Sequence, residues 1–167
     1  GAPGVDGVTV EAFPSLARAS WPRVRAALLS GHYVPQPVRR VSIPKASGGQ
    51  RELGIPTVQD RLIQQAILQV LTPLFDPTFS ESSFGFRPGR SAHGAVKQVK
   101  AFASAGYKVA VDLDLEKFFD RVQHDVLMRL LSARIRDTRL LRLIGRFLRA
   151  GMAVGEEVTP RRQGTPQ

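Results

Sequence analysis

The chain has no cysteine, which excludes disulfide bonds, zinc sites with thiolate ligands and cysteine nucleophiles. It has no apolar run long enough to span a membrane, and its N-terminus lacks the charged and then apolar pattern of a secretory signal. Its three histidines, His32, His93 and His124, are not spaced like metal ligands. These absences favour a protein of a reducing, intracellular compartment with no membrane partner.

Acidic residues are also few. The 14 Asp and Glu are outnumbered by 24 Lys and Arg, which gives a net charge of +10 and a pI near 11.2. Such an excess in a non-repetitive chain favours a polyanionic partner, because neutralising phosphates releases their counterions. A basic, solubilising surface or a genome biased towards Arg would give the same count. Charge alone therefore favours nucleic acid without establishing it.

The chain has enough apolar residues, 43% of 167, to bury one sizeable core with a smaller subdomain attached. Hydrophobic periodicity predicts both helices and strands, so we expect an α+β fold. The predicted helices cover 9–30, 58–74, 91–105, 124–132 and 138–150, the predicted strands cover 38–44 and 51–55 around a flexible tip, and 152–161 is predicted to be a β-hairpin. Ser91 can cap the helix 91–105, and Pro73 and Pro77 are expected to close the helix 58–74.

The most informative stretch is Val109–Asp120, in which apolar and acidic residues alternate. Period two predicts a half-buried strand with Asp112 and Asp114 on one face. Carboxylates at a strand end are typical of magnesium sites. A solvated position is favoured for Asp112, whereas Asp114 lies just before the chain turns. One carboxylate does not make a two-metal site, and Asp125 and Asp137 are better explained as helix-capping residues.

Four blocks of this sequence, in the same order, resemble the N-terminal half of a group II intron-type reverse transcriptase, the intron-encoded maturase family of bacteria. Any single block would be weak evidence, but four in register are specific. They are residues 1–7 (GAPGVDG), which resemble the N-terminal extension motif, 43–65, which resemble the fingers block, 79–91, and 112–124, which resemble the catalytic block of the palm.

The resemblance implies a right-hand polymerase fold. Residues 1–105 would form a helical fingers subdomain with a small β-hairpin, and 106–167 the first part of the palm sheet. The second catalytic motif of the family, a strand and turn with paired aspartates, is not present in this sequence. Because this motif is missing, we expect the metal site of the chain to be incomplete. The first residue is Gly1 rather than Met, so we expect an excerpt or a processed product.

The resemblance also assigns roles to residues of the palm and fingers. The Asp114 side chain and the Leu115 backbone carbonyl would hold Mg²⁺. Phe119 would exclude a ribose 2′-hydroxyl by steric contact, with core packing as the alternative. Lys45 and Arg51, beside the mobile hairpin tip, would grip the incoming triphosphate, although two exposed loop charges would look the same.

Further residues are implied to contact nucleic acid. Arg87 and Arg90 would meet template or primer phosphates, and a structural salt bridge is the competing interpretation. Arg61 could extend this track or be solvated. Gln167 occupies the position of the glutamine with which the family contacts template and nucleotide.

The implied function of the parent protein is RNA-directed DNA synthesis by two-metal nucleotidyl transfer. Its partners would be an RNA template, a DNA primer, deoxynucleotide triphosphates and intron RNA, in the bacterial cytoplasm. We expect the 167-residue chain alone to be inactive. The alternative is a non-catalytic RNA-binding or maturase fragment that assists intron folding. The particular intron, splicing activity, a defence-associated role and the oligomeric state stay open.

Overall fold

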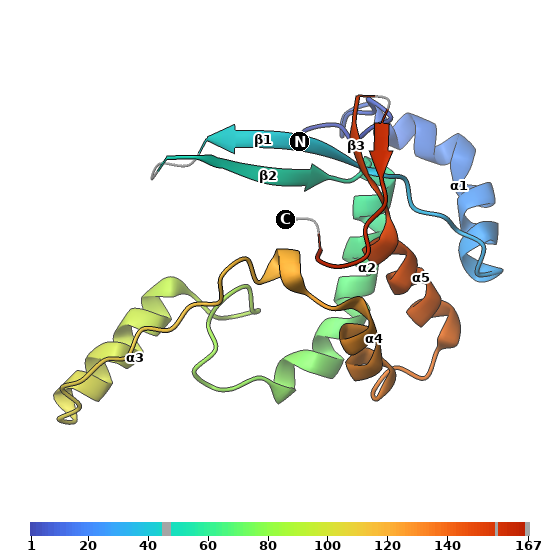
Figure 1. The fold of residues 1–167 in the computed structure, drawn as a ribbon. Coiled ribbons are helices and arrows are strands. Elements are labelled where there is room, and N and C mark those ends of the chain that lie inside the picture. Colours follow the sequence, from blue (N-terminus) through green and yellow to red (C-terminus); the bar gives the residue numbers. More distant parts are fainter. Residues whose placement is uncertain (45–47, 156, 166–167) are drawn as a thin grey trace. The chain divides into compact units, whose positions relative to one another are not determined.

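The computed structural model describes residues 1–44, 48–155 and 157–165 of the chain. It confirms the α+β fold (Figure 1). In the described residues, no helix combines the length and the apolar character needed to cross a membrane. The helices are α1 (Phe13–Leu29), α2 (Val58–Phe75), α3 (Ala92–Ser104), α4 (His124–Ser132) and α5 (Thr138–Arg149), with short 3₁₀ helices η1 (Asp76–Thr78) and η2 (Phe119–Arg121), and the strands are β1 (Val38–Pro44), β2 (Gln50–Ile55), β3 (Met152–Val154) and β4 (Glu157–Thr159).

The chain divides into two compact units. Unit 1 contains residues 1–63 and 116–167, and unit 2 contains residues 64–115. The division of the family into fingers (1–105) and palm (106–167) follows other boundaries, and it stays a prediction.

Unit 1 is built on a four-stranded sheet with the order β2-β1-β3-β4 (Figure 1). β1 and β2 form the predicted antiparallel hairpin, and Gly48 and Gly49 beside its tip have φ of +87° and +82°, which suits glycine. The predicted second hairpin is also present as β3 and β4. The two hairpins join because β1 runs parallel to β3, with Val38 opposite Met152. Sequence patterns did not predict this long-range pairing.

The helices of unit 1 are tied together by arginines of α5. Arg146 donates from Nη1 to the carbonyls of Gly31 (2.6 Å) and Tyr33 (2.7 Å), and Arg139 donates to the carbonyl of Leu29 (3.1 Å). A helix end leaves carbonyls such as that of Leu29 unpaired, so these arginines pair carbonyls of the last residue of α1 and of the segment that follows it. The buried apolar side chains of the described chain are Val24, Tyr33, Val38, Val58, Ile63, Ile135, Leu148 and Ala153, all in unit 1.

Unit 2 consists of the second half of α2, η1, the following loop, α3 and an extended segment. Ser91 caps α3 as predicted, because its Oγ accepts from the backbone N–H of Gly94 at 3.1 Å. Of the two prolines expected to close α2, Pro73 lies inside the helix, which continues to Phe75, whereas Pro77 lies in η1 directly after its end. None of the described residues 64–115 is buried.

Candidate functional site

The acidic segment 107–115 has no ladder hydrogen bonds and is not a strand of the described sheet. Both the apolar and the acidic side of the pattern are exposed, with Val109 at 87% and Leu113 at 88% exposure on the apolar side. The prediction of a half-buried strand is therefore wrong for this chain. None of the strands in the described part of the chain pairs with this segment.

Asp114 and Leu115 are the last residues of unit 2, and both are exposed. A carboxylate and a carbonyl are oxygen donors of the kind that magnesium prefers. Within the described residues, however, no three or more His, Cys, Asp or Glu side chains gather closely enough to hold a metal ion. The described part of the chain thus supplies part of a magnesium site at most. The metal-binding role of Asp114 stays a prediction.

Phe119 begins η2 in unit 1, and its ring is 49% exposed. The ring meets Phe118 edge to face, with 5.4 Å between the ring centroids. A half-exposed ring is available to contact a ligand, and this position differs from the fully buried one that simple core packing would give. Its role in sugar discrimination stays a prediction.

The backbone around Phe119 is held by the C-terminal segment of unit 1, which sequence reasoning missed. Thr165 N–H donates to the Phe119 carbonyl (2.8 Å), and Gly164 N–H donates to the Val122 carbonyl (2.8 Å). His124, only 7% exposed, is hydrogen-bonded through Nε2 to the Gly164 carbonyl at 2.7 Å. Gly164 has φ of +77°, and a Cβ there would lie 2.7 Å from the Asp120 carbonyl oxygen. Only glycine fits this close approach.

The hairpin residues expected to grip a triphosphate are only partly described. Lys45 lies outside the described residues, as does Gln167. Arg51 is exposed on β2, opposite Ile43 of β1. The neighbouring Arg40 and Glu52 form an ion pair, and the hydrogen bond from Arg40 lowers the pKa of the Glu52 carboxyl. Triphosphate binding by Arg51 stays a prediction.

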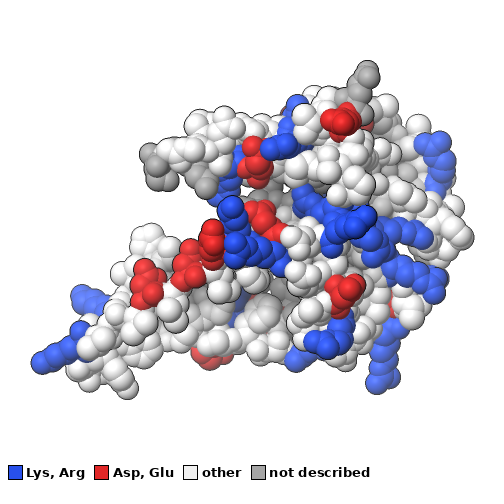
Figure 2. All heavy atoms as spheres, in the orientation of Figure 1, with Lys and Arg blue, Asp and Glu red and all other residues white. Residues whose placement is uncertain are grey.

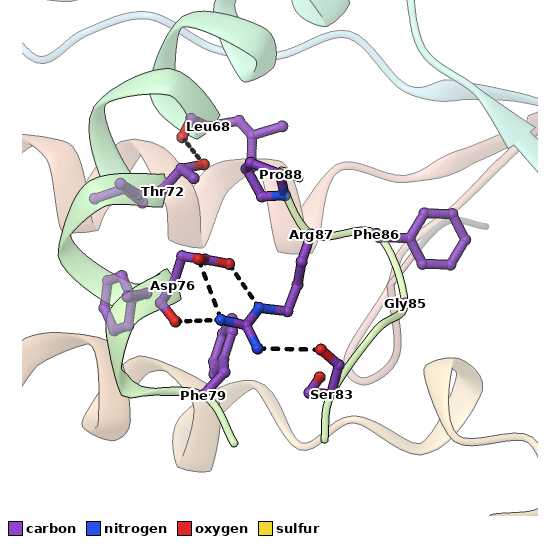
Figure 3. Close-up of a pocket in the computed structure, with 11 residues that line it drawn as sticks. Leu68, Thr72, Asp76, Phe79, Ser83, Gly85, Phe86, Arg87 and Pro88 are labelled. Atoms are coloured by element: carbon purple, nitrogen blue, oxygen red, sulfur yellow. Dashed lines mark hydrogen bonds and ion pairs between the residues drawn. The ribbon is translucent and has the colours of Figure 1, made fainter. Parts of the chain in front are cut away.

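Arg87 is turned inward in unit 2, with a side chain only 7% exposed. It contacts Asp76 through Nε (2.8 Å) and Nη2 (3.2 Å) and donates to the carbonyls of Asp76 and Ser83 (Figure 3). It also donates to the carbonyl of Ser80 at 2.8 Å. The hydrogen bond from Arg87 lowers the pKa of the Asp76 carboxyl. A pocket of about 440 Å³ lies between this pair and α2 residues such as Leu68. The salt-bridge alternative is the arrangement observed, and phosphate binding by Arg87 stays a prediction.

Arg90 is also paired within unit 2. It donates to the Glu81 carboxylate at 2.6 Å and to the Glu81 carbonyl at 3.1 Å, and its guanidinium lies 5.5 Å from the centre of the Phe84 ring. The hydrogen bond from Arg90 lowers the pKa of the Glu81 carboxyl. Both loop arginines thus have internal carboxylate partners, and nucleic acid binding by Arg90 stays a prediction.

A buried carboxylate in unit 1 was not singled out by sequence reasoning. Asp60 is 1% exposed and accepts from the Tyr33 hydroxyl (2.7 Å), the Thr57 hydroxyl (2.8 Å) and the Gln36 N–H (3.1 Å). Burial raises its pKa, although these donors oppose the shift. Thr57 three residues before Asp60 is a capping-box pattern that could have signalled the pair. Nearby, Arg61 donates to the Ala2 carbonyl at 3.0 Å, which ties it to the N-terminal loop.

Positive charge is concentrated in unit 1. Unit 1 contains 19 Lys and Arg against 10 Asp and Glu, whereas unit 2 contains 5 against 4. In the view of Figure 2, basic side chains gather over the part of unit 1 that holds α5. A pocket of about 340 Å³ on unit 1 is also bordered by Arg40, Arg161 and Arg162. Most of the basic residues of the chain, and with them most of its positive charge, therefore belong to unit 1.

This chain is similar in sequence to a known protein family and to several known proteins. Residues 43–167 match the family described as reverse transcriptase (RNA-dependent DNA polymerase). Protein YkfC of Escherichia coli is 40% identical over 153 residues, which are 89% of this chain and 40% of that protein. The group II intron-encoded protein LtrA of Lactococcus lactis is 38% identical over 146 residues, 87% of this chain and 24% of LtrA.

A solved structure has a similar fold. The partial Cas6-RT-Cas1–Cas2 complex aligns with a TM-score of 0.56 and 24% identity over 90% of this chain and 26% of that chain. The chain thus spans less than half the length of these proteins. A reverse transcriptase domain acts on nucleic acid and, in general, requires a divalent metal ion. The matched region, which is most of the chain, shows that this chain belongs to the reverse transcriptase family, and it is similar to a group II intron-encoded protein.

Proposed function

We propose that this chain is the fingers and first palm region of an RNA-directed DNA polymerase that copies an RNA template from a DNA primer with deoxynucleotide triphosphates. The observation that carries the proposal is the family match over residues 43–167, which include the Asp112–Asp120 block. The names of relatives such as LtrA, a group II intron-encoded protein, favour intron RNA as a natural partner. A cytoplasmic location in a bacterium is part of the same proposal.

Each assigned residue has a distinct role in this proposal. Asp114 and the Leu115 carbonyl would supply oxygen donors for Mg²⁺, which stabilises negative charge on phosphate oxygens when bound. Phe119 would stand against the sugar of the incoming nucleotide, held there by the hydrogen bond from Thr165 N–H to its carbonyl. Arg51, Lys45 and Gln167 would contact the nucleotide.

Primer extension on an RNA template tests the proposal. The 167-residue chain should give no extension, because its described residues contain no complete metal cluster. A longer form that carries the paired aspartates of the family should extend the primer and lose this activity with Asp114→Asn, while Asp112→Asn should retain it. Extension by the 167-residue chain itself would contradict the incomplete-site argument.

A second candidate function is RNA binding without catalysis, as in a maturase fragment. The excess of 19 basic over 10 acidic residues in unit 1 favours it. A salt titration of RNA affinity measures the phosphate contacts directly, because each neutralised phosphate steepens the fall of affinity with salt. An RNA affinity that does not change with salt concentration would contradict a phosphate-binding surface.

A further inference from the structure

The loop of unit 2 from Phe79 to Arg90, called the 79–90 loop, carries three aromatic rings with different environments. The Phe79 ring lies under the Arg87 guanidinium and the Phe84 ring lies under the Arg90 guanidinium, each at 5.5 Å. Phe86, by contrast, has a relative exposure of 111%. Two rings therefore pack against guanidinium groups of the loop, whereas Phe86 borders the pocket of about 440 Å³ and is otherwise exposed.

Phe86 is also in an unfavourable backbone conformation. Its φ is +55°, a region that side chains with a Cβ seldom adopt. The strained backbone lowers stability, and the exposed ring gains no burial energy that would offset this cost. Such outliers are found at ligand-binding sites. Folding alone gives no reason for phenylalanine here, and glycine would relieve the strain.

Arg87 fixes the direction of this ring. Its internal hydrogen bonds to Asp76, Ser80 and Ser83 anchor the backbone next to Phe86. In Figure 3 the Arg87 side chain points towards Asp76, while the Phe86 ring points away from this pair. The loop thus presents a flat apolar surface from an anchored position, which lowers the entropy lost when a ligand binds.

The charges of the loop are neutralised internally, since Arg87 is paired with Asp76 and Arg90 with Glu81. The loop would therefore add little electrostatic attraction to a phosphate chain. An exposed aromatic ring suits the face of an unpaired base, which stacks on such rings whatever its sequence. We propose that Phe86 is a stacking platform for an unpaired base of single-stranded nucleic acid. If the proposed function holds, this strand is the RNA template.

The test measures binding of the 167-residue chain to a short single-stranded RNA that contains 2-aminopurine, whose fluorescence falls on stacking. Phe86→Ala should weaken binding about tenfold, and Phe86→Leu should do the same because leucine has no π face. Phe86→Trp should keep affinity and quenching. The slope of affinity against salt should stay unchanged in all three variants, since no phosphate contact is lost.

Tyr107→Ala is the matched control, because Tyr107 is another exposed aromatic of unit 2 (71%) whose ring packs against Phe102. It should not change affinity, and Phe86→Ala should not change the affinity for duplex RNA, which has no unpaired base. Single-stranded DNA should respond to Phe86→Ala as RNA does. Full affinity of Phe86→Leu for the single-stranded RNA would overturn stacking. A wild-type chain that sediments as a dimer, and a Phe86→Ala variant that does not, would also overturn it, because Phe86 would then contact a second copy of the chain.

The outcomes also separate this inference from the proposed function. RNA binding with a steep salt slope but no response to the Phe86 variants would overturn the stacking platform alone. A wild-type chain that does not bind RNA at all would overturn the stacking platform, whereas the proposed function would still be decided by primer extension with the longer form. The fluorescence of 2-aminopurine in the bound RNA reports stacking independently of affinity. If Phe86→Ala weakened binding but left the quenching of the bound RNA unchanged, this result would also count against stacking on Phe86.

Discussion

The two compact units differ in how they are stabilised. Unit 1 contains the buried apolar side chains of the described structure, a four-stranded sheet and the buried Asp60 network. Unit 2 has no buried residue among 64–115, and Arg87 with its carboxylate and carbonyl partners is its main interior contact. The difference suggests that unit 1 resists unfolding as a whole, whereas unit 2 opens locally.

The strongest test of this difference is the loss of the Asp60 carboxylate. Asp60→Ala leaves the Tyr33 and Thr57 hydroxyls and the Gln36 N–H without their acceptor inside unit 1. We expect a loss of about 3–5 kcal/mol in the free energy of unfolding, measured with urea. Asp112→Ala, at an exposed carboxylate of unit 2, is the control and should change it by less than about 0.5 kcal/mol. Equal effects would contradict the proposed division.

Gly164→Ala should have the next largest effect. Both Gly164 (φ +77°) and Gly155 (φ +60°) have positive φ, but only at Gly164 would a Cβ collide with backbone, 2.7 Å from the Asp120 carbonyl oxygen. Gly155→Ala should cost about 1 kcal/mol from backbone strain alone, and Gly164→Ala about 2–3 kcal/mol because the collision adds to it. Thermal unfolding of both variants measures the difference. Similar losses would mean that the C-terminal segment moves aside freely.

The charge difference between the units predicts where RNA phosphates bind. Reversing the exposed α5 residues Arg142 and Arg149 to Glu should weaken RNA binding about tenfold and flatten its salt dependence. The same reversal at the exposed α3 residues Lys97 and Lys100 should have a smaller effect, because unit 2 is nearly neutral. Affinity and salt slope are measured for both double variants. A larger effect of the α3 variant would contradict the prediction that unit 1 binds the RNA phosphates.

Local patterns in the sequence predicted most of the fold. The α3 cap at Ser91 and the hairpin of β1 and β2 depend on neighbouring residues, and both are confirmed. The parallel pairing of Val38 with Met152 joins segments more than a hundred residues apart, so no local pattern could contain it. The prediction of a strand over 107–115 was wrong for a related reason. Alternating apolar and polar residues are typical of a strand, but a strand also needs a neighbouring strand with which to form hydrogen bonds.

The candidate site was predicted unevenly for similar physical reasons. Motif resemblance selected Asp114 and Phe119 as candidates, whose roles stay predictions. Residue type alone could not say which charges are paired internally. Arg87 was expected at a phosphate, and it is instead directed to Asp76. The buried Asp60 was missed because acidic residues in the first turn of a helix are usually exposed. Only the three donors around it, from separate segments, make its burial favourable.

The smallest effect that we expect is an opposite response of two carboxyls to pH. Arg87 lowers the pKa of Asp76 in unit 2, whereas burial raises the pKa of Asp60 in unit 1, both relative to an ordinary value of 3.8. The contribution of Asp76 to stability is therefore present above pH 3.8 and is lost as the pH falls through its lower folded pKa. The contribution of Asp60 has the reverse sign: it is present below pH 3.8 and is lost as the pH rises through its higher folded pKa.

Carboxyl ¹³C NMR measures both titrations in the same sample, with Asp76 expected below and Asp60 above the ordinary pKa. Arg87→Met is the matched variant: it should raise the pKa of Asp76 towards its ordinary value and leave Asp60 unchanged, because only Asp76 is paired with Arg87. If Asp60 titrated below the ordinary value, its three hydrogen bonds would outweigh burial, and the two units would then use their carboxylates in the same way. If Asp76 did not shift in Arg87→Met, the ion pair would not be what holds the 79–90 loop, and the rigid presentation of Phe86 would lose its physical basis.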